Sequence, residues 1–72
     1  MRFLLVGGAG AVGRDLTPAL LSLGHAVRIL DKDPEALDIS GHENLELLKG
    51  RVEDRSLAAK AVQDTEVVVH HH

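Results

Sequence analysis

Residues 3–14 read FLLVGGAGAVGR, in which an apolar run ends at a group of glycines and a helical pattern follows. Gly7, Gly8, Gly10 and Gly13 fall within this short stretch. In a helix or strand, glycine lowers stability by roughly 0.5–1 kcal/mol relative to alanine. Four glycines in so short a stretch therefore need an explanation. Either the chain makes a plain tight turn here, or a ligand must approach the backbone closely.

Length and composition limit the chain to one small domain. It has 72 residues, a net charge of -3, no cysteine and a single aromatic residue, Phe3. Without a basic stripe or stacking rings, we expect no nucleic-acid partner. Without an apolar run of roughly 18–20 residues, we expect no membrane span. Because Met1 leads directly into a predicted strand, we expect no signal peptide and a cytoplasmic protein.

Four apolar segments alternate with helical patterns along the chain. Short runs rich in valine and leucine predict strands over 2–6, 26–30, 44–49 and 66–69. Helices are predicted over 11–23, from Asp33 to about Ser40, and from Asp54 to about Gln63. Gly24 is the expected C-cap of the first helix, and Asp54 the expected N-cap of the last. The order βαβαβαβ predicts an α/β fold: a three-layer half-Rossmann unit whose parallel sheet has the strand order 3-2-1-4.

The glycine loop lies at the first strand-to-helix junction, where a doubly wound sheet holds a dinucleotide pyrophosphate on free N–H groups. Gly7 or Gly8 would make the tight turn. Gly10 would let the diphosphate approach, and Gly13 would let the helix pack closely on the sheet. The loop follows a strand and opens a helix, which is the context that this motif needs. The candidate cofactor-binding residues here are Gly7, Gly10, Ala11, Val12 and Gly13.

Asp31 ends the predicted second strand, VRILD, 18 residues after Gly13. An acid about 20 residues beyond the glycine loop accepts hydrogen bonds from the adenosine ribose hydroxyls in dinucleotide-binding folds. Its charge would repel a 2′-phosphate, which favours NAD over NADP. The neighbouring Lys32 could accept that phosphate, so NADP stays possible. The alternative is that Asp31 is a solvated acid in a turn.

The motifs resemble those of the extended or atypical short-chain dehydrogenase/reductases, the NAD-dependent epimerase/dehydratase family. VGGAGAVG resembles the GxxGxxG loop of that family, and LLSLGHAVRILD is similar to its passage from the first helix into the second strand. LELLKGRVED resembles the third strand with its following turn, and DTEVVVH resembles the fourth strand. The resemblance implies the NAD(P)-binding segment of an oxidoreductase or of a nucleotide-sugar epimerase/dehydratase.

The chain departs from this family at two places. Arg51 stands where the family has an aspartate that contacts adenine, although Val52 could still pack against the ring. The chain also has no tyrosine, so the Tyr-x-x-x-Lys motif of the family is absent. The resemblance therefore implies cofactor binding without catalytic residues, and the isolated chain is expected to be inactive.

Residues 1–69 match the first half of a doubly wound domain, and we expect them to be a truncated NAD(P)-binding domain. We interpret residues 70–72, all histidine, as the remnant of a purification tag; a native tail or a metal-ligand cluster are the alternatives. His25 and His42 follow glycines and are expected to be turn residues, not metal ligands. Truncation would leave one edge of the Val67–Val69 strand open. We therefore expect a homo-oligomer formed through that edge.

Two other interpretations remain open. GAGAVG together with DKDPEAL also resembles the nucleotide-sensing regulatory domains of TrkA-N type, which bind NAD(H) or adenine nucleotides without doing chemistry. The chain could also be a structural half-fold that retains no binding. The glycine loop and Asp31 do not distinguish the regulatory interpretation from the dehydrogenase one, whereas the fourth-strand segment that ends in VVVH favours the dehydrogenase family.

Overall fold

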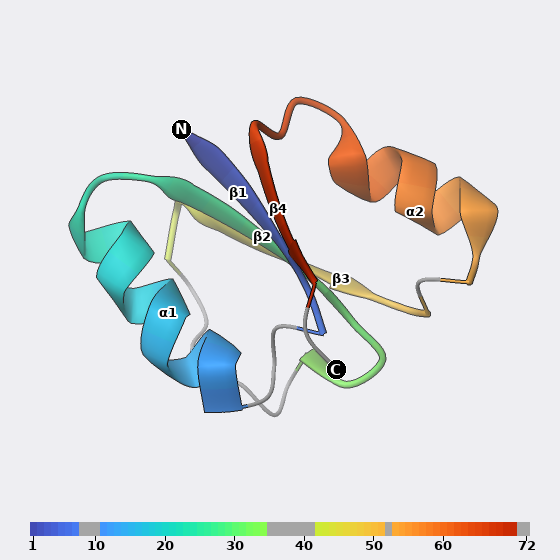
Figure 1. Ribbon diagram of the computed structural model, residues 1–72, viewed down its shortest axis with the longest axis horizontal. Helices are drawn as coiled ribbons and strands as arrows, with labels where there is room; N and C mark the ends of the chain where they lie inside the picture. Colours follow the sequence, from blue (N-terminus) through green and yellow to red (C-terminus); the bar gives the residue numbers. More distant parts are fainter. Residues whose placement is uncertain (8–10, 35–41, 52, 71–72) are drawn as a thin grey trace.

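The computed structural model describes residues 1–7, 11–34, 42–51 and 53–70. Its elements follow in the order β1 (Arg2–Val6), α1 (Ala11–Ser22), β2 (Ala26–Asp31), β3 (Leu45–Lys49), α2 (Arg55–Val62) and β4 (Val67–His70), shown in Figure 1. Each strand lies within one residue of its predicted bounds. The helix expected from Asp33 to about Ser40 falls mostly on residues outside the described ranges.

The strands form one parallel sheet in the order β3-β2-β1-β4, which confirms the predicted topology. Val6, at the end of β1, is paired with Leu30 of β2 on one side and with His70 of β4 on the other. Asp31, at the end of β2, is paired with Lys49 of β3. Since all strands run the same way, the residues that follow them gather at one edge of the sheet. We call this the carboxyl edge.

Two apolar clusters sit on opposite faces of the sheet, because successive strand residues point to opposite sides. The α1 side buries Leu5, Leu20, Val27 and Ile29. The α2 side buries Leu4, Val6, Leu30 and Ala61. One helix therefore covers each face, and the three-layer α/β arrangement predicted from the sequence is confirmed (Figure 1).

Both expected helix caps are present. Gly24 follows α1 with φ +85°, and its N–H donates to the carbonyl oxygen of Leu21 at 3.0 Å. The N–H of His25 donates to the carbonyl of Leu20 at 3.1 Å, which completes a Schellman end. At the start of α2, Oδ1 of Asp54 accepts from the N–H of Leu57 at 3.1 Å. These caps fix where the two helices meet the turns around them.

The two outer strands of the sheet differ in character. In β3, Glu46 and Lys49 are exposed charged residues. In β4, the residues before His70 are three valines, and Val68 is 55% exposed. Charges on an outer strand discourage pairing with another chain, whereas an uncharged apolar edge permits it.

Within the part of the chain that the structure describes, no helix is long and apolar enough to cross a membrane.

Candidate functional site

Gly7 turns the chain away from β1 at the carboxyl edge. Its φ is +75°, a conformation that costs a residue with a Cβ roughly 1–2 kcal/mol. Its N–H donates to the carbonyl oxygen of Leu30 at 2.8 Å, so the turn is anchored to the neighbouring strand β2. This is the turn geometry that the sequence predicts for Gly7. Gly8 and Gly10 lie outside the described residues.

Helix α1 opens at Ala11, four residues after Gly7 along the chain, and its first turn includes Val12 and Gly13. Gly13 is buried, as expected of a position where the helix packs closely on the sheet. The first turn contains no acidic residue. The first N–H groups of a helix lack partners within it and carry a partial positive charge, so this end favours an external anion. In contrast, the start of α2 is occupied by the carboxylate of its own Asp54.

Asp31 is the last residue of β2, the strand next to β1, and lies at the same carboxyl edge. It is half-buried, and its Oδ1 accepts a hydrogen bond from the N–H of Asp33 at 2.9 Å. Its carbonyl oxygen accepts from the N–H of Gly50 at 2.9 Å, which ties the end of β2 to the turn after β3. The carboxylate is therefore held in one orientation at the edge. Lys32, the next residue, is exposed.

The turn between β3 and α2 forms the far side of the carboxyl edge. Gly50 packs so tightly on Leu57 that a Cβ at this position would lie 2.1 Å from Leu57 Cδ2. Arg51 is exposed, and its carbonyl oxygen accepts from the N–H of Asp54 at 3.1 Å. Val52, the expected adenine contact, lies outside the described residues.

The structure thus brings most of the predicted site residues to one edge of the sheet. These are Gly7, Ala11, Val12, Gly13, Asp31 and Lys32, with Arg51 following the next strand. Free helix N–H groups suit a pyrophosphate, and a fixed carboxylate at the end of the adjacent strand suits a ribose diol. The arrangement is the one that an adenosine diphosphate moiety requires.

The histidines do not assemble a metal site in the described part of the chain. His25 lies in the turn after α1, and its ring meets the Phe3 ring edge-to-face, with 5.2 Å between centroids. His42 is exposed, and its Nδ1 accepts from the N–H of Asn44 at 3.1 Å. Among the described residues, no group of three or more histidines, aspartates or glutamates could hold a metal ion.

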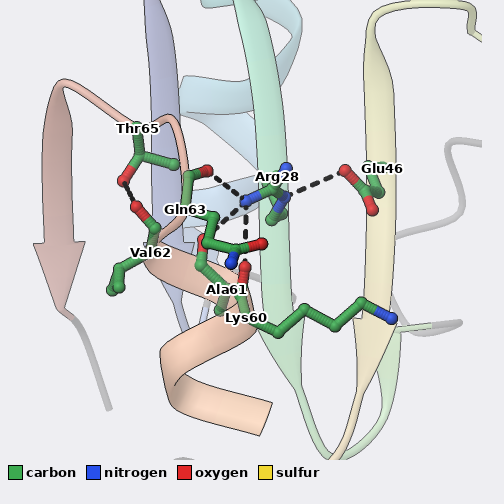
Figure 2. A network of polar contacts seen from close by, with 7 residues as sticks. All are labelled: Arg28, Glu46, Lys60, Ala61, Val62, Gln63 and Thr65. Atoms are coloured by element: carbon green, nitrogen blue, oxygen red, sulfur yellow. Dashed lines mark hydrogen bonds and ion pairs between the residues drawn. The ribbon is translucent and has the colours of Figure 1, made fainter.

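Sequence reasoning missed one buried charge, Arg28, in the middle of β2. Its side chain is 10% exposed, and its Nε donates to Oε1 of Glu46 at 2.9 Å. Its Nη1 donates to the carbonyl oxygens of Ala61 and Gln63, both at 2.8 Å, and of Lys60 at 3.3 Å. Figure 2 shows the guanidinium between β3 and the end of α2. In the sequence, the only indication of this buried charge is an arginine inside the apolar run AVRIL.

This network supports the fold and does not reach the carboxyl edge. The last carbonyl groups of a helix lack partners within it, and a cation there also matches the negative end of the helix dipole. Arg28 therefore provides donors to the carbonyl groups at the end of α2 from a largely buried position. It also fixes the α2–β4 connection against β2.

A family of proteins described as NAD(P)H-binding matches residues 7–72 of the chain. The chain is 41% identical over 69 residues to a 3β-hydroxysteroid dehydrogenase/Δ5→4-isomerase of Mycobacterium tuberculosis, and 35% identical over 69 residues to a 3β-hydroxysteroid dehydrogenase of Mycolicibacterium neoaurum. Each match covers 96% of this chain and 18% of the relative. The chain therefore spans less than a fifth of the length of these curated relatives.

Solved structures show the same architecture. The enzyme WbmG of Bordetella bronchiseptica, in complex with NAD, superposes with a TM-score of 0.86 at 29% identity, covering 100% of this chain and 24% of that one. A Rossmann-fold NAD(P)-binding family protein of Shigella flexneri superposes with a TM-score of 0.87 at 17% identity, covering 99% of this chain and 36% of that one. At that lower identity the second likeness shows the fold alone.

Proposed function

The chain belongs to the family of NAD(P)H-binding proteins, and from this premise we propose which of its residues hold the cofactor. The N-terminus of α1 binds the pyrophosphate, while Gly7 makes the turn before the helix and Gly13 lets the helix pack closely on the sheet. Asp31 binds the adenosine ribose. The observation that carries this proposal is the joint position of the α1 N-terminus and the fixed Asp31 carboxylate at one edge of the sheet. Gly10, Ala11, Val12 and Val52 are assigned to the same site from the sequence motif.

The activity of a longer protein that contains this segment is a further part of the proposal. The related steroid dehydrogenases and the structure with bound NAD favour an oxidoreductase or an epimerase/dehydratase over a nucleotide-sensing regulatory domain of TrkA-N type. In such an enzyme the cofactor carries the hydride, and the protein positions it. This segment would supply binding alone, because a chain without tyrosine cannot carry the Tyr-x-x-x-Lys motif that the resemblance implies. A cytoplasmic location stays a prediction.

Calorimetric titration of the chain with NAD tests the assignment. Saturable binding is expected, and ADP-ribose is expected to bind about as well, because the residues named here are assigned to the ADP part of the cofactor and none to the nicotinamide. Gly13→Val is the informative variant, since a side chain at this buried position would push α1 away from the sheet. Ala19→Val serves as its control, because it introduces the same branched side chain at an exposed position of the same helix. Equal NAD binding by both variants would count against the assigned site.

We also propose that β4 associates with β4 of a second copy. This strand exposes Val68 and lacks the charges that protect β3. The test is to measure the oligomeric state of the original chain and of the Val68→Lys variant by sedimentation over a range of concentrations. The original chain should dimerise and the variant should remain monomeric. A monomer at every concentration for both would refute the association.

A further inference from the structure

We infer that the chain binds a free α-amino acid at the edge of the sheet where the strands begin, through Arg2 and Asp64. We call this the amino edge. It lies at the opposite end of the strands from the proposed cofactor site, because all strands run the same way. The inference therefore goes beyond the proposed function and does not depend on it. It rests on a polar cavity and on an aspartate whose position the fold does not favour.

A cavity of about 510 Å³ opens at the amino edge. Its lining includes Arg2 at the start of β1, Asn44 just before β3, and Asp64 and Glu66 just before β4. The volume falls within the range of roughly 300–1,000 Å³ that is usual for small-molecule sites. Because these lining residues are polar or charged, the cavity suits a small charged molecule better than an apolar one.

The starts of β1 and β4 are held together on the side of this cavity. The N–H of Glu66 donates to the carbonyl oxygen of Arg2 at 3.0 Å, and the N–H of Arg2 donates to Oε2 of Glu66. Strand residues two apart point to the same face, so Arg2 shares the face of Leu4, which α2 covers. The side chain of Arg2 therefore lies on the side of the sheet on which α2 ends and Asp64 follows.

Asp64 is unfavourable to the fold in two respects. It directly follows Gln63, the C-cap of α2, and with φ +62° it is the only residue other than glycine that has a positive φ among the described residues. Glycine or asparagine usually takes this position. A carboxylate here also places negative charge at the negative end of the helix dipole. The cation at this helix end, Arg28, is paired with Glu46 instead. Residues that break local rules in this way cluster at binding sites.

Arg2 and Asp64 line one cavity with opposite charges and do not neutralise each other. Within the described part of the chain, no ion pair or hydrogen bond joins either side chain to a partner. A free α-amino acid carries an ammonium and a carboxylate on one carbon atom. The ammonium suits the carboxylate of Asp64, and the guanidinium of Arg2 offers paired N–H donors to the ligand carboxylate. A ligand with only one of these charges would leave one of the two side chains without a partner.

NMR titration of the chain with the common α-amino acids tests the inference. The best of them should shift the amide resonances of Arg2, Asp64 and Glu66 with a dissociation constant of about 1–10 mM, because exposed charges are screened by water. The amides of Gly7 and Asp31, at the carboxyl edge, should not shift. Two derivatives of that amino acid should each bind at least about fivefold more weakly: the N-acetyl form, which lacks the ammonium, and the carboxamide, which lacks the carboxylate.

Two variants test the assigned side chains. Asp64→Asn and Arg2→Gln should each weaken binding of the amino acid by about fivefold or more. Asparagine tolerates a positive φ, so Asp64→Asn should leave the stability of the chain unchanged or raise it. Asp15→Asn is the matched control, because it removes the same charge from an exposed position of α1. It should leave the affinity within about twofold, since a charge outside the cavity is screened by salt.

Several results would overturn the inference. No amino acid could shift the amides of Arg2, Asp64 and Glu66 at concentrations up to about 50 mM. Either derivative could bind as tightly as its parent amino acid, which would mean that a single charge is recognised. Asp64→Asn could bind as tightly as the original chain, or Asp15→Asn could lose as much affinity as Asp64→Asn does. A chain that binds the amino acid but not NAD would contradict the proposed function alone.

Discussion

Nη1 of Arg28 lies 2.8 Å from the carbonyl oxygen of Ala61, so that a charge buried in β2 closes the end of a helix 33 residues further along the chain. The same nitrogen bonds the carbonyl of Gln63, just beyond α2. Glu46, the acidic partner of this arginine, is half-exposed, with 52% of its side chain in water. The two partners therefore contribute unequally to stability.

Arg28→Met should destabilise the chain by about 2–4 kcal/mol, because it removes the donor to the buried carbonyl of Ala61 and to the carbonyl of Gln63. Glu46→Gln should cost no more than about 1 kcal/mol, since a half-exposed ion pair is screened by water. Urea unfolding followed by circular dichroism measures both, and an Arg28→Met chain that is unfolded from the start agrees with the prediction. Equal stability of the two variants would show that the helix carbonyls do not depend on Arg28.

Thr17→Val should stabilise the chain by about 1 kcal/mol. Thr17 is fully buried in α1, and its Oγ1 has no hydrogen-bond partner among the described residues. Valine keeps the shape and removes the unsatisfied hydroxyl. Thr17→Ser is the matched control: it keeps the hydroxyl, loses a methyl group and should destabilise by about 1 kcal/mol. Thermal unfolding should rank the variants Val, Thr, Ser from most to least stable, and any other order contradicts the prediction.

Gly50→Ala should destabilise the chain by about 1–3 kcal/mol, because the new methyl group would overlap Leu57. Removing most of the leucine side chain should relieve that overlap. The double variant Gly50→Ala, Leu57→Ala is thus expected to be more stable than the sum of the single effects predicts, by at least about 0.5 kcal/mol. A double-mutant cycle of urea unfolding measures this difference, and strict additivity would rule out the steric explanation.

Asp31→Asn should weaken NAD binding by about fivefold to tenfold, because a neutral amide is a poorer acceptor for the ribose hydroxyls than a carboxylate. The same change removes a negative charge and should weaken NADP binding less. Asp33→Asn is the control: it removes the same charge from an exposed position in the same turn. Calorimetry on the two variants tests this prediction. Equal losses of NAD affinity in both variants would show that Asp31 makes no specific contact with the ribose.

Much of the fold could be predicted because the relevant signals are local. Glycine at the end of an apolar run, the Asp54 cap and the valine-rich segments each depend on a few neighbouring residues, and the strand order follows from alternation of strands and helices. The positions of Gly7 and Asp31 at one edge follow from the same rule. These features are confirmed by the sheet order and by the two caps.

The features that escaped prediction depend on residues far apart in sequence. Arg28 inside an apolar strand has no local partner, and its acceptors become neighbours only after α2 crosses the sheet. The unpartnered hydroxyl of Thr17 is likewise invisible in a helical pattern that tolerates threonine. The pairing of Asp31 with Lys49 requires the register of β2 and β3, which periodicity does not fix.

The pairing of β1 with β4 joins Phe3 to Val67, 64 positions later in the chain. Ribosomes make proteins from the N-terminus, so the second neighbour of β1 emerges only after nearly all of this segment has been synthesised. Contacts between such distant residues are slow to form, because a long loop must close before they contribute any stability. Until then one edge of β1 has no partner strand. During synthesis this edge is open to pairing with another chain, which a chaperone would prevent.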